Sequence, residues 1–128
     1  MKIKYFIIAI LTIFVVTIVS GILYLNSGQK EVLSTSIGNI DLSNYEDGNY
    51  IGKFEGYRWS NSVAVIVKDH KIEDIKIMEG QQFRLDEVEK ELINNVITKQ
   101  SVDVDVVSGA TVSSKAILKA IENAFNKE

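Results

Sequence analysis

The chain opens with one continuous apolar stretch and then changes to shorter, periodic patterns of apolar residues. Residues 5–25 form a 21-residue run without a charged side chain. In a helix that rises about 1.5 Å per residue, such a run spans the roughly 30 Å hydrocarbon core of a bilayer. The hydroxyls of Thr12 and Thr17 interrupt the run, but they can bond to carbonyls of their own helix. The pattern predicts one N-terminal transmembrane helix over residues 5–25.

Two lysines, Lys2 and Lys4, precede this run. The positive-inside rule then predicts that residues 1–4 are cytoplasmic and that the domain lies outside the cytoplasm, on a single-pass protein of the cell membrane. A cleavable signal peptide is the alternative, but its apolar region is about 7–15 residues long and ends in a small-residue cleavage site. The run here is longer, and Ser20-Gly21 offers only a weak site. We therefore favour an uncleaved anchor in the lipid bilayer.

Residues 26–46 are polar, contain several serines and glycines, and show neither helical nor strand periodicity. This composition predicts a linker. Apolar residues within it allow part of the segment to lie on the domain; they are Val32, Leu33, Ile37, Ile40 and Leu42. About 80 residues remain, residues 47–128, which is enough for one small hydrophobic core but not for two domains.

Two β-rich runs begin this domain. Both runs are rich in apolar β-branched residues at alternate positions, namely Val63, Val65 and Val67 in the first, which alternate with Ala64 and Ile66, and Ile75 and Ile77 on either side of Lys76 in the second. Asp69 and His70 lie between the runs, and both residue types tolerate the positive φ of a tight hairpin turn. Residues 48–57 predict a further strand, with Tyr50, Phe54 and Tyr57 as candidate packing residues.

Helical spacing follows the strands in two places. Leu85, Val88, Leu92 and Val96 predict one amphipathic helix, and Ile117, Ala120, Ile121, Ala124 and Phe125 predict a second over residues 115–125. Ser113 and Ser114 precede the second helix and are its N-cap candidates. The predicted fold class is therefore α+β: a small antiparallel sheet packed with two helices, preceded by one transmembrane helix.

The segment directly before the last helix carries the most suggestive chemistry. Residues 105–111 read Asp-Val-Val-Ser-Gly-Ala-Thr. The free N–H groups of a helix's first turn favour an anion, and Gly109 would let the backbone approach such a group closely. The residues alone thus predict an anion site with Thr111 beside it. A serine or threonine that merely caps the helix is the alternative.

The same residues also resemble a known motif. Asp-x-x-Ser-Gly-Ala-Thr before a helix resembles the flavinylation motif of the FMN-binding domain family, which includes flavin subunits of sodium-pumping quinone reductases and related bacterial electron-transfer complexes. Residues 47–52, Asp-Gly-Asn-Tyr-Ile-Gly, resemble the family's opening Asp-Gly-x-Tyr-x-Gly. The resemblance runs from about residue 47 to residue 125. Residues 78–82 depart from the pattern, because they lack the Glu-Thr pair that many members have there.

The resemblance implies FMN as the cofactor, joined through a phosphoester to Thr111 by a flavin transferase. Ser108, Gly109 and Ala110 would complete the cofactor-binding motif, with Ser108 and Gly109 shaping the turn. Asp105 would bond to the turn's backbone, be recognised by the transferase, or both. The implied role is an electron carrier that serves redox partner proteins in the membrane or envelope, rather than a stand-alone enzyme.

Other residues of the chain carry weaker signals of chemistry. Trp59 and Tyr57 could cover a flavin face, although aromatic residues more often serve packing alone. His70 is the only histidine, so a metal site is not expected, and no Gly-x-Ser-x-Gly elbow supports a hydrolase with Ser108 as nucleophile. The absence of cysteine excludes disulfides, Fe–S clusters and thiolate metal sites.

The net charge of the chain beyond residue 29 limits the classes of partner that it can bind. Beyond residue 29 the chain has 12 basic and 17 acidic residues, a net charge of −5. Nucleic-acid recognition needs a clustered basic surface, so no nucleic-acid partner is expected. The alternative function, from a different class, is a cofactor-free binding or structural module that an anchor holds in the cell envelope.

Overall fold

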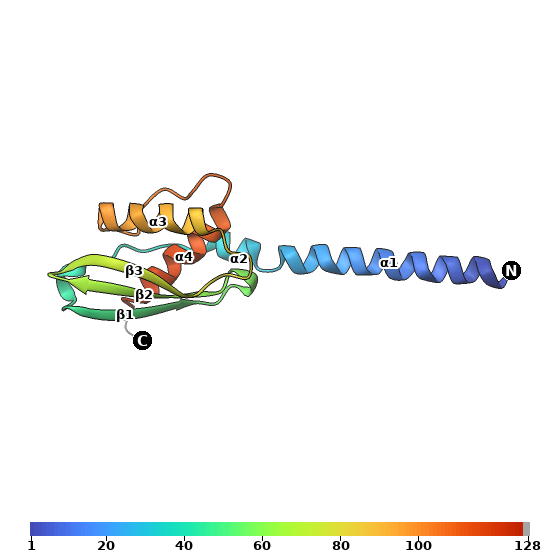
Figure 1. The fold of residues 1–128 in the computed structure, drawn as a ribbon, viewed down its shortest axis with the longest axis horizontal. Helices are drawn as coiled ribbons and strands as arrows, with labels where there is room; N and C mark the ends of the chain where they lie inside the picture. The colour runs from blue at the N-terminus through green and yellow to red at the C-terminus, as the bar shows by residue number, and fades with distance from the viewer. Residues whose placement is uncertain (127–128) are drawn as a thin grey trace.

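A long helix leads into a small α+β domain in which helices pack on a three-stranded antiparallel sheet (Figure 1). The computed structural model describes residues 1–126. Its helices are α1 (Lys2–Asn26), α2 (Gln29–Ser34), α3 (Asp86–Lys99) and α4 (Thr111–Asn123), and its strands are β1 (Gly48–Phe54), β2 (Asn61–Lys68) and β3 (Lys71–Glu79). Two 3₁₀ turns join them, η1 (Leu42–Asn44) and η2 (Tyr57–Trp59). The predicted fold class is confirmed.

Helix α1 is long and apolar enough to cross a membrane, and the rest of the described chain buries none of its residues. A helix that is apolar all round and unburied has the surface of a membrane span or a signal sequence. Its two threonines bond internally as expected. Thr12 Oγ1 donates to the carbonyl of Ile8 at 3.0 Å, and Thr17 Oγ1 donates to the carbonyl of Ile13 at 2.8 Å.

The sheet has the order β1-β2-β3, and both strand pairs are antiparallel. The predicted hairpin is confirmed: β2 and β3 are joined by Asp69 and His70, whose φ angles are +51° and +58°. Two successive positive φ angles are those of a type I′ turn, whose twist matches the strands that it joins. The backbone N–H of Asp69 also donates to Asp47 Oδ1 at 2.7 Å, which ties the hairpin tip to the start of β1.

The strand predicted over residues 48–57 ends earlier, at Phe54. Phe54 and Tyr50 pack against the core as expected. Tyr57 was predicted as a packing residue, but it does not reach the core, because η2 turns the chain there and leaves Tyr57 62% exposed. Trp59, only 5% exposed, takes the interior position instead.

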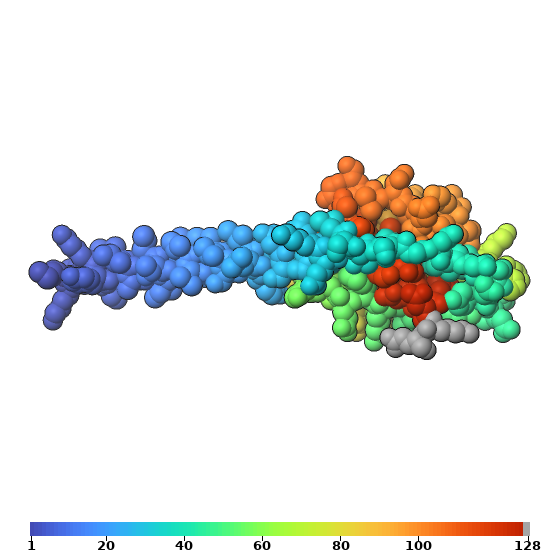
Figure 2. Space-filling model, turned by 180° about the vertical axis from the view of Figure 1, so that it is seen from behind, coloured from blue at the N-terminus to red at the C-terminus, as the bar shows by residue number. Residues whose placement is uncertain are grey.

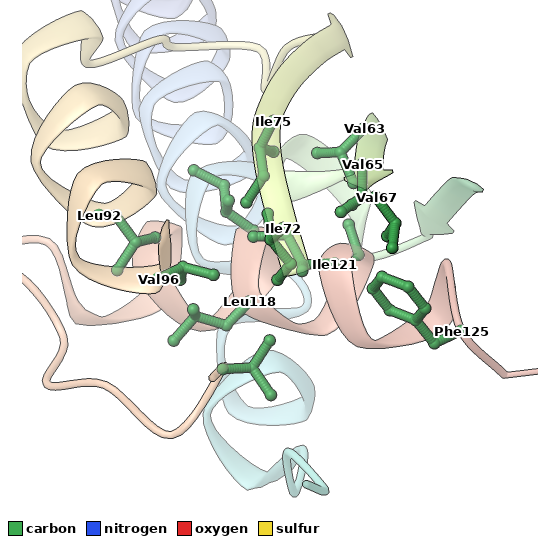
Figure 3. Packing of buried hydrophobic residues seen from close by; sticks show 13 residues of the cluster. Val63, Val65, Val67, Ile72, Ile75, Leu92, Val96, Leu118, Ile121 and Phe125 are labelled. Atoms are coloured by element: carbon green, nitrogen blue, oxygen red, sulfur yellow. The ribbon is translucent and has the colours of Figure 1, made fainter. Parts of the chain in front are cut away.

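The core lies between one face of the sheet and helices α3 and α4. Figure 3 shows these side chains pointing toward one another from the strands and the two helices. The buried residues are Val63, Val65, Val67, Ile72, Ile75, Leu92, Val96, Val102, Ile117, Leu118, Ala120, Ile121 and Phe125. Alternation in the strands and helical spacing in α4 therefore placed the core correctly.

Helix α3 presents part of its predicted face to this core. Leu92 and Val96 are buried, whereas Leu85 occupies the N-cap position, outside the helix, and is half-exposed. Glu89 is buried in the first turn of α3, and Arg84 Nη2 lies 2.7 Å from Glu89 Oε2. The hydrogen bond and the negative charge of Glu89 raise the pKa of Arg84 above its ordinary value.

Helix α4 is the central element, and it is buried on nearly every side. It begins at Thr111, four residues before the predicted start at residue 115. Ser113 and Ser114 therefore lie inside the first turn, and their predicted role as N-caps is wrong. Ser114 Oγ instead accepts a hydrogen bond from the N–H of Val107 at 3.1 Å, which fixes the preceding loop on the helix.

Residues 26–46 are not the unstructured linker that their composition predicted. They form α2 and η1. We call residues 35–46, which include η1, the strap, because this segment follows α4 along its length (Figure 2). Val32 of α2 is fully buried against Trp59 and Ala116. The apolar residues of the strap pack on the core, namely Ile37, Ile40, Leu42 and Tyr45. Their burial outweighs the weak local preference of this segment for structure.

Candidate functional site

The Ser-Gly pair of the motif lies in a tight turn at the start of α4. The N–H of Ala110 donates to the carbonyl of Val107 at 3.0 Å, and Gly109 has a φ of +78°. A positive φ at the third of four residues defines a type II turn and favours glycine there. A Cβ atom on Gly109 would meet no atom within 4 Å. Glycine is therefore required here for its backbone conformation, and the space above the turn is open.

Thr111 follows this turn as the first residue of α4, and it is exposed. Ala110 is buried and holds the turn against the domain, while Ser108 is exposed. Within residues 1–126, no side chain caps the N-terminus of α4, whose capping position is Ala110. The first-turn N–H groups and the positive end of the helix dipole therefore remain available to a phosphate next to the Thr111 hydroxyl.

Asp105 lies six residues before Thr111 and is exposed in the loop between α3 and α4. Within residues 1–126, its carboxylate makes no hydrogen bond to the turn, although an Asx-type bond was one of its two predicted roles. The loop is held by other groups, among them the bond from Val107 to Ser114. An exposed carboxylate near the acceptor threonine remains available to a modifying enzyme.

A small cleft opens beside the first turn of α4. It has a volume of about 180 Å³ and is lined by Arg58, Trp59, Gln81, Phe83, Leu85 and Ser113. Gln81 is buried, and its Nε2 donates to the carbonyl of Ser113 at 2.9 Å, which joins the end of β3 to α4. The cleft thus brings together three segments that are distant in sequence, and Ser113 places it at the first turn of α4, the turn that begins with Thr111.

Arg58 places a positive charge in this cleft, next to the rings of Trp59 and Phe83. Its guanidinium carbon lies 4.2 Å from the centroid of the Trp59 ring and 5.5 Å from that of Phe83. Arg58 Nε is buried and has no hydrogen-bond partner among the described residues. Leaving a buried donor unpaired costs about 1–3 kcal/mol. A bound ligand that offers an acceptor atom would remove this cost.

The residues fit a flavin chemically, because a planar aromatic ring with carbonyl acceptors suits a site of stacked aromatics and an unpaired donor. Small-molecule sites usually measure about 300–1,000 Å³. At about 180 Å³, the cleft would therefore cover only part of such a ring. A larger hollow of about 580 Å³ lies near the opposite end of α4, lined by Ile51, Lys53, Asn123 and Asn126, away from the Ser-Gly-Ala-Thr turn.

Other candidates lie away from this site. His70 is at the hairpin tip, where its Nδ1 lies 2.9 Å from the carbonyl oxygen of Tyr45, so it is not paired with Ser108. In the part of the chain that the structure describes, no group of three His, Cys, Asp or Glu residues could hold a metal ion. Of the two predicted aromatic contacts, Trp59 lines the cleft and Tyr57 does not.

Sequence reasoning missed Arg58, Gln81 and Phe83 as residues of the site. Arg58 is adjacent to Trp59, a candidate flavin contact, but an arginine in a turn carries no pattern of its own. Gln81 lies in the segment that departs from the family's usual residues. Only the meeting of η2, the end of β3 and α4 shows that these side chains share one cleft.

A comparison with protein families connects this geometry to a cofactor. The model of the FMN-binding domain family matches residues 56–126, which is more than half of the 128-residue chain. This range includes both the cleft and the Ser-Gly-Ala-Thr turn, while the Asp-Gly-x-Tyr-x-Gly stretch at residues 47–52 precedes it. A search of curated proteins gives no match. With the predicted motif in a turn at the head of α4, the chain belongs to the FMN-binding domain family.

Proposed function

We propose that this protein is a membrane-anchored, extracytoplasmic electron carrier whose FMN is joined through a phosphoester to Thr111. One observation carries the proposal: in a chain of the FMN-binding domain family, Thr111 is exposed at an uncapped helix N-terminus directly after a type II turn. Such a position offers a hydroxyl for attachment and N–H groups for the phosphate.

In the attachment step, Thr111 Oγ1 bonds to the phosphorus of an activated FMN ester, such as a flavin dinucleotide. The bond from phosphorus to the leaving nucleotide breaks, and the hydroxyl proton passes to a base. The only histidine of the chain, His70, lies at the hairpin tip. We assign the base and the orientation of the donor to a separate flavin transferase.

FMN supplies reversible redox chemistry when it is bound. The chain's own residues position it: the turn around Gly109 sets the attachment point, and Trp59 and Phe83 offer aromatic surface. Arg58 places a positive charge in the cleft, and such a charge favours a flavin that has gained electrons. Because the cleft is small, part of the ring would remain accessible to redox partner proteins.

Localisation is part of the same proposal. Helix α1 supplies a span, and Lys2 and Lys4 before it favour a cytoplasmic N-terminus. A covalent bond suits a flavin outside the cytoplasm, where a dissociable cofactor would be lost by diffusion. Protease added to intact cells should digest the domain, and alkaline carbonate should leave the protein in the membrane. Protection of the domain would reverse the orientation, and release by carbonate would remove the anchor.

The attachment is tested by intact mass after co-expression with a flavin transferase. The wild type should gain the mass of FMN less one water, and its band should fluoresce on a denaturing gel. Thr111→Ala should show neither change, whereas Ser108→Ala, altered at a nearby exposed hydroxyl, should still be labelled. A labelled Thr111→Ala protein would disprove the acceptor assignment, and an unlabelled, colourless wild type would favour the cofactor-free module.

The carrier role is tested by comparing how fast different reductants reduce the flavin. The chain contains no Gly-x-Gly-x-x-Gly fingerprint for a dinucleotide. We therefore expect dithionite to bleach the flavin absorbance quickly in stopped-flow mixing, and NADH and NADPH to do so only slowly. Rapid bleaching that saturates with NADH concentration would show a donor site and make the protein an enzyme.

A further inference from the structure

Helix α1 is joined to the domain by a short, packed connection. Only Ser27 and Gly28 separate α1 from α2, and α2 is fixed to the domain by the buried side chain of Val32. Tyr24, in the last turn of α1, donates from its hydroxyl to Gln82 Oε1 at 3.2 Å. The Tyr57 ring covers Gly28 so closely that a Cβ there would lie 2.1 Å from it. The domain is therefore held at the end of α1 rather than suspended on a tether.

The candidate flavin site lies at this same end of the domain. Val32 packs beside Val112 and Ala116 in the first half of α4, close to Thr111. The loop that bonds to Tyr24 through Gln82 also supplies Gln81 and Phe83 to the cleft. Figure 1 shows α4 starting near α2 and α1 and running away from them toward the C-terminus. We call this the α1 end of the domain.

Exposed apolar side chains gather at the α1 end. Outside α1, the described chain has seven exposed large hydrophobic residues: Leu33, Ile51, Tyr57, Met78, Phe83, Leu85 and Val106. All except Ile51 belong to segments at the α1 end, namely α2, η2, the end of β3 with the loop after it, and the loop before α4. Tyr57, Phe83 and Leu85 are 62%, 55% and 48% exposed. A cluster of this kind marks a surface that contacts something apolar.

We propose that the α1 end rests on the bilayer that α1 spans, with Tyr57, Phe83 and Leu85 in its interfacial layer, so that the Thr111 site works at the membrane surface. This rests on the anchor role of α1 in the proposed function. We call the exposed apolar residues of the α1 end the apolar rim. Lipid is what this rim contacts, because only a two-residue joint separates the domain from the apolar surface of α1. Aromatic residues such as these favour the boundary between hydrocarbon and water.

The chain contains its own probe for this contact. Trp59 is the only tryptophan, and it lies in the wall of the cleft at the α1 end. The full-length Thr111→Ala protein is reconstituted into phosphatidylcholine–phosphatidylglycerol vesicles whose lipids carry a nitroxide near the headgroup. Because this variant carries no flavin, only lipid quenches the indole. We expect strong quenching of Trp59 fluorescence relative to unlabelled vesicles.

A matched control moves the probe to the other end of the domain. In Trp59→Phe/His70→Trp, the indole lies at the hairpin tip, a strand length of about 25 Å farther from the bilayer for the eight residues of β2. We expect little quenching there. Equal quenching at both positions would show that the domain lies on its side or tumbles against the membrane, and it would overturn the proposed orientation.

A second pair of variants separates lipid contact from the constraint of the joint. A flexible Gly-Ser insertion between Ser27 and Gly28 should leave Trp59 quenched, because the rim itself binds lipid. Adding Phe83→Asp and Leu85→Asp to the insertion should abolish quenching, while circular dichroism shows the fold intact. Loss of quenching with the insertion alone would overturn the proposal. So would quenching that appears only in native membranes, which would assign the rim to a protein partner.

The experiment distinguishes a wrong membrane anchor from a wrong contact between the domain and the bilayer. If the protein does not float with the vesicles, α1 is no anchor and the proposed localisation is wrong. If it floats but Trp59 is not quenched, the anchor stands and the membrane contact of the domain is wrong. Flavin attachment is measured separately by mass, so its outcome affects neither result.

Discussion

The two ends of α4 differ in how completely the protein covers its own surface. At the C-terminal end, the rings of Tyr45, Tyr50 and Phe125 form a closed cluster with centroids 4.9–5.5 Å apart. The Tyr45 hydroxyl donates to the carbonyl of Phe125, and the nearby hairpin turn has the preferred geometry of its type. The three rings and the Tyr45 hydroxyl at this end therefore find their partners within the chain.

The N-terminal end of α4 is incomplete by the same measures. Helix α4 has no side-chain cap there, Arg58 Nε is buried without a partner among the described residues, and Phe83 is exposed. Gly109 keeps an open space above the turn. Each of these features costs stability or leaves a group unsatisfied. The C-terminal end of α4 thus supports the fold, whereas the N-terminal end has the unpaired groups that we propose a cofactor and a membrane complete.

The largest effect on stability is expected from the closed end. Phe125→Ala removes a buried ring from the aromatic cluster and should lower the free energy of unfolding by about 3–5 kcal/mol. Phe83→Ala is the matched control at the open end, and its loss should stay below about 1 kcal/mol, because the ring is exposed. Denaturant unfolding in detergent measures both. Similar losses for the two variants would contradict the division between the ends.

Gly52 lies where β1 crosses the C-terminal part of α4 without a side chain between them. A Cβ on Gly52 would lie 1.9 Å from the carbonyl oxygen of Ala120 and 2.5 Å from the N of Ala124. Gly52→Ala must therefore push the strand off the helix, at a cost of about 3 kcal/mol. In the control Gly48→Ala, the nearest atom is 3.9 Å away, in the Tyr50 ring, so the thermal midpoint should change little. A stable Gly52→Ala protein would contradict this close packing.

A smaller effect is expected at the open end, where Gly109 is needed only for its positive φ. Gly109→Ala should cost about 1 kcal/mol in stability, because the new Cβ strains the backbone but meets no neighbour. The displaced turn should also lower the fraction of protein that carries flavin. Gly109→Asn is the control, since asparagine tolerates this conformation better. If the alanine variant were labelled as fully as the asparagine variant, the turn would not position Thr111.

Local patterns in the sequence predicted the helices and strands in which buried residues recur at a regular spacing. The hairpin follows from alternating valines and a turn that accepts positive φ, and the buried face of α4 follows from the spacing of Ile117, Ile121 and Phe125. The start of α4 was placed four residues late, because serine was expected to cap it. The tight turn at Gly109 sets that boundary instead, and turn geometry outweighed capping preference.

Contacts between distant segments could not be predicted in this way. Helix α2 has only six residues and exists because Val32 finds a buried site next to Trp59. The motif was recognised from its residues, whereas the cleft beside it depends on where η2 and the end of β3 meet α4. Arg58 shows the limit most clearly, since its contacts with Trp59 and Phe83 exist only in the folded chain.

The smallest expected effect lies in the strap that covers α4 between the two ends. The hydroxyl of Ser43 donates to Asp41 Oδ1 at 2.6 Å, and this bond, together with that from the Ser43 N–H, holds the pKa of Asp41 below its ordinary value of 3.8. A lowered pKa in the folded state stabilises the protein above the unfolded pKa, and this stability is lost as the pH falls through the folded pKa. The difference in thermal midpoint between wild type and Asp41→Ala should therefore be constant from about pH 7 to pH 5 and should shrink below about pH 4. Because Asp41 is exposed, water screens its charge and the effect is small.

Asp41→Asn keeps an acceptor for Ser43 without a titrating group, so its difference from Asp41→Ala should not depend on pH. A difference that instead widened in acid would show that the Asp41 carboxylate destabilises the strap.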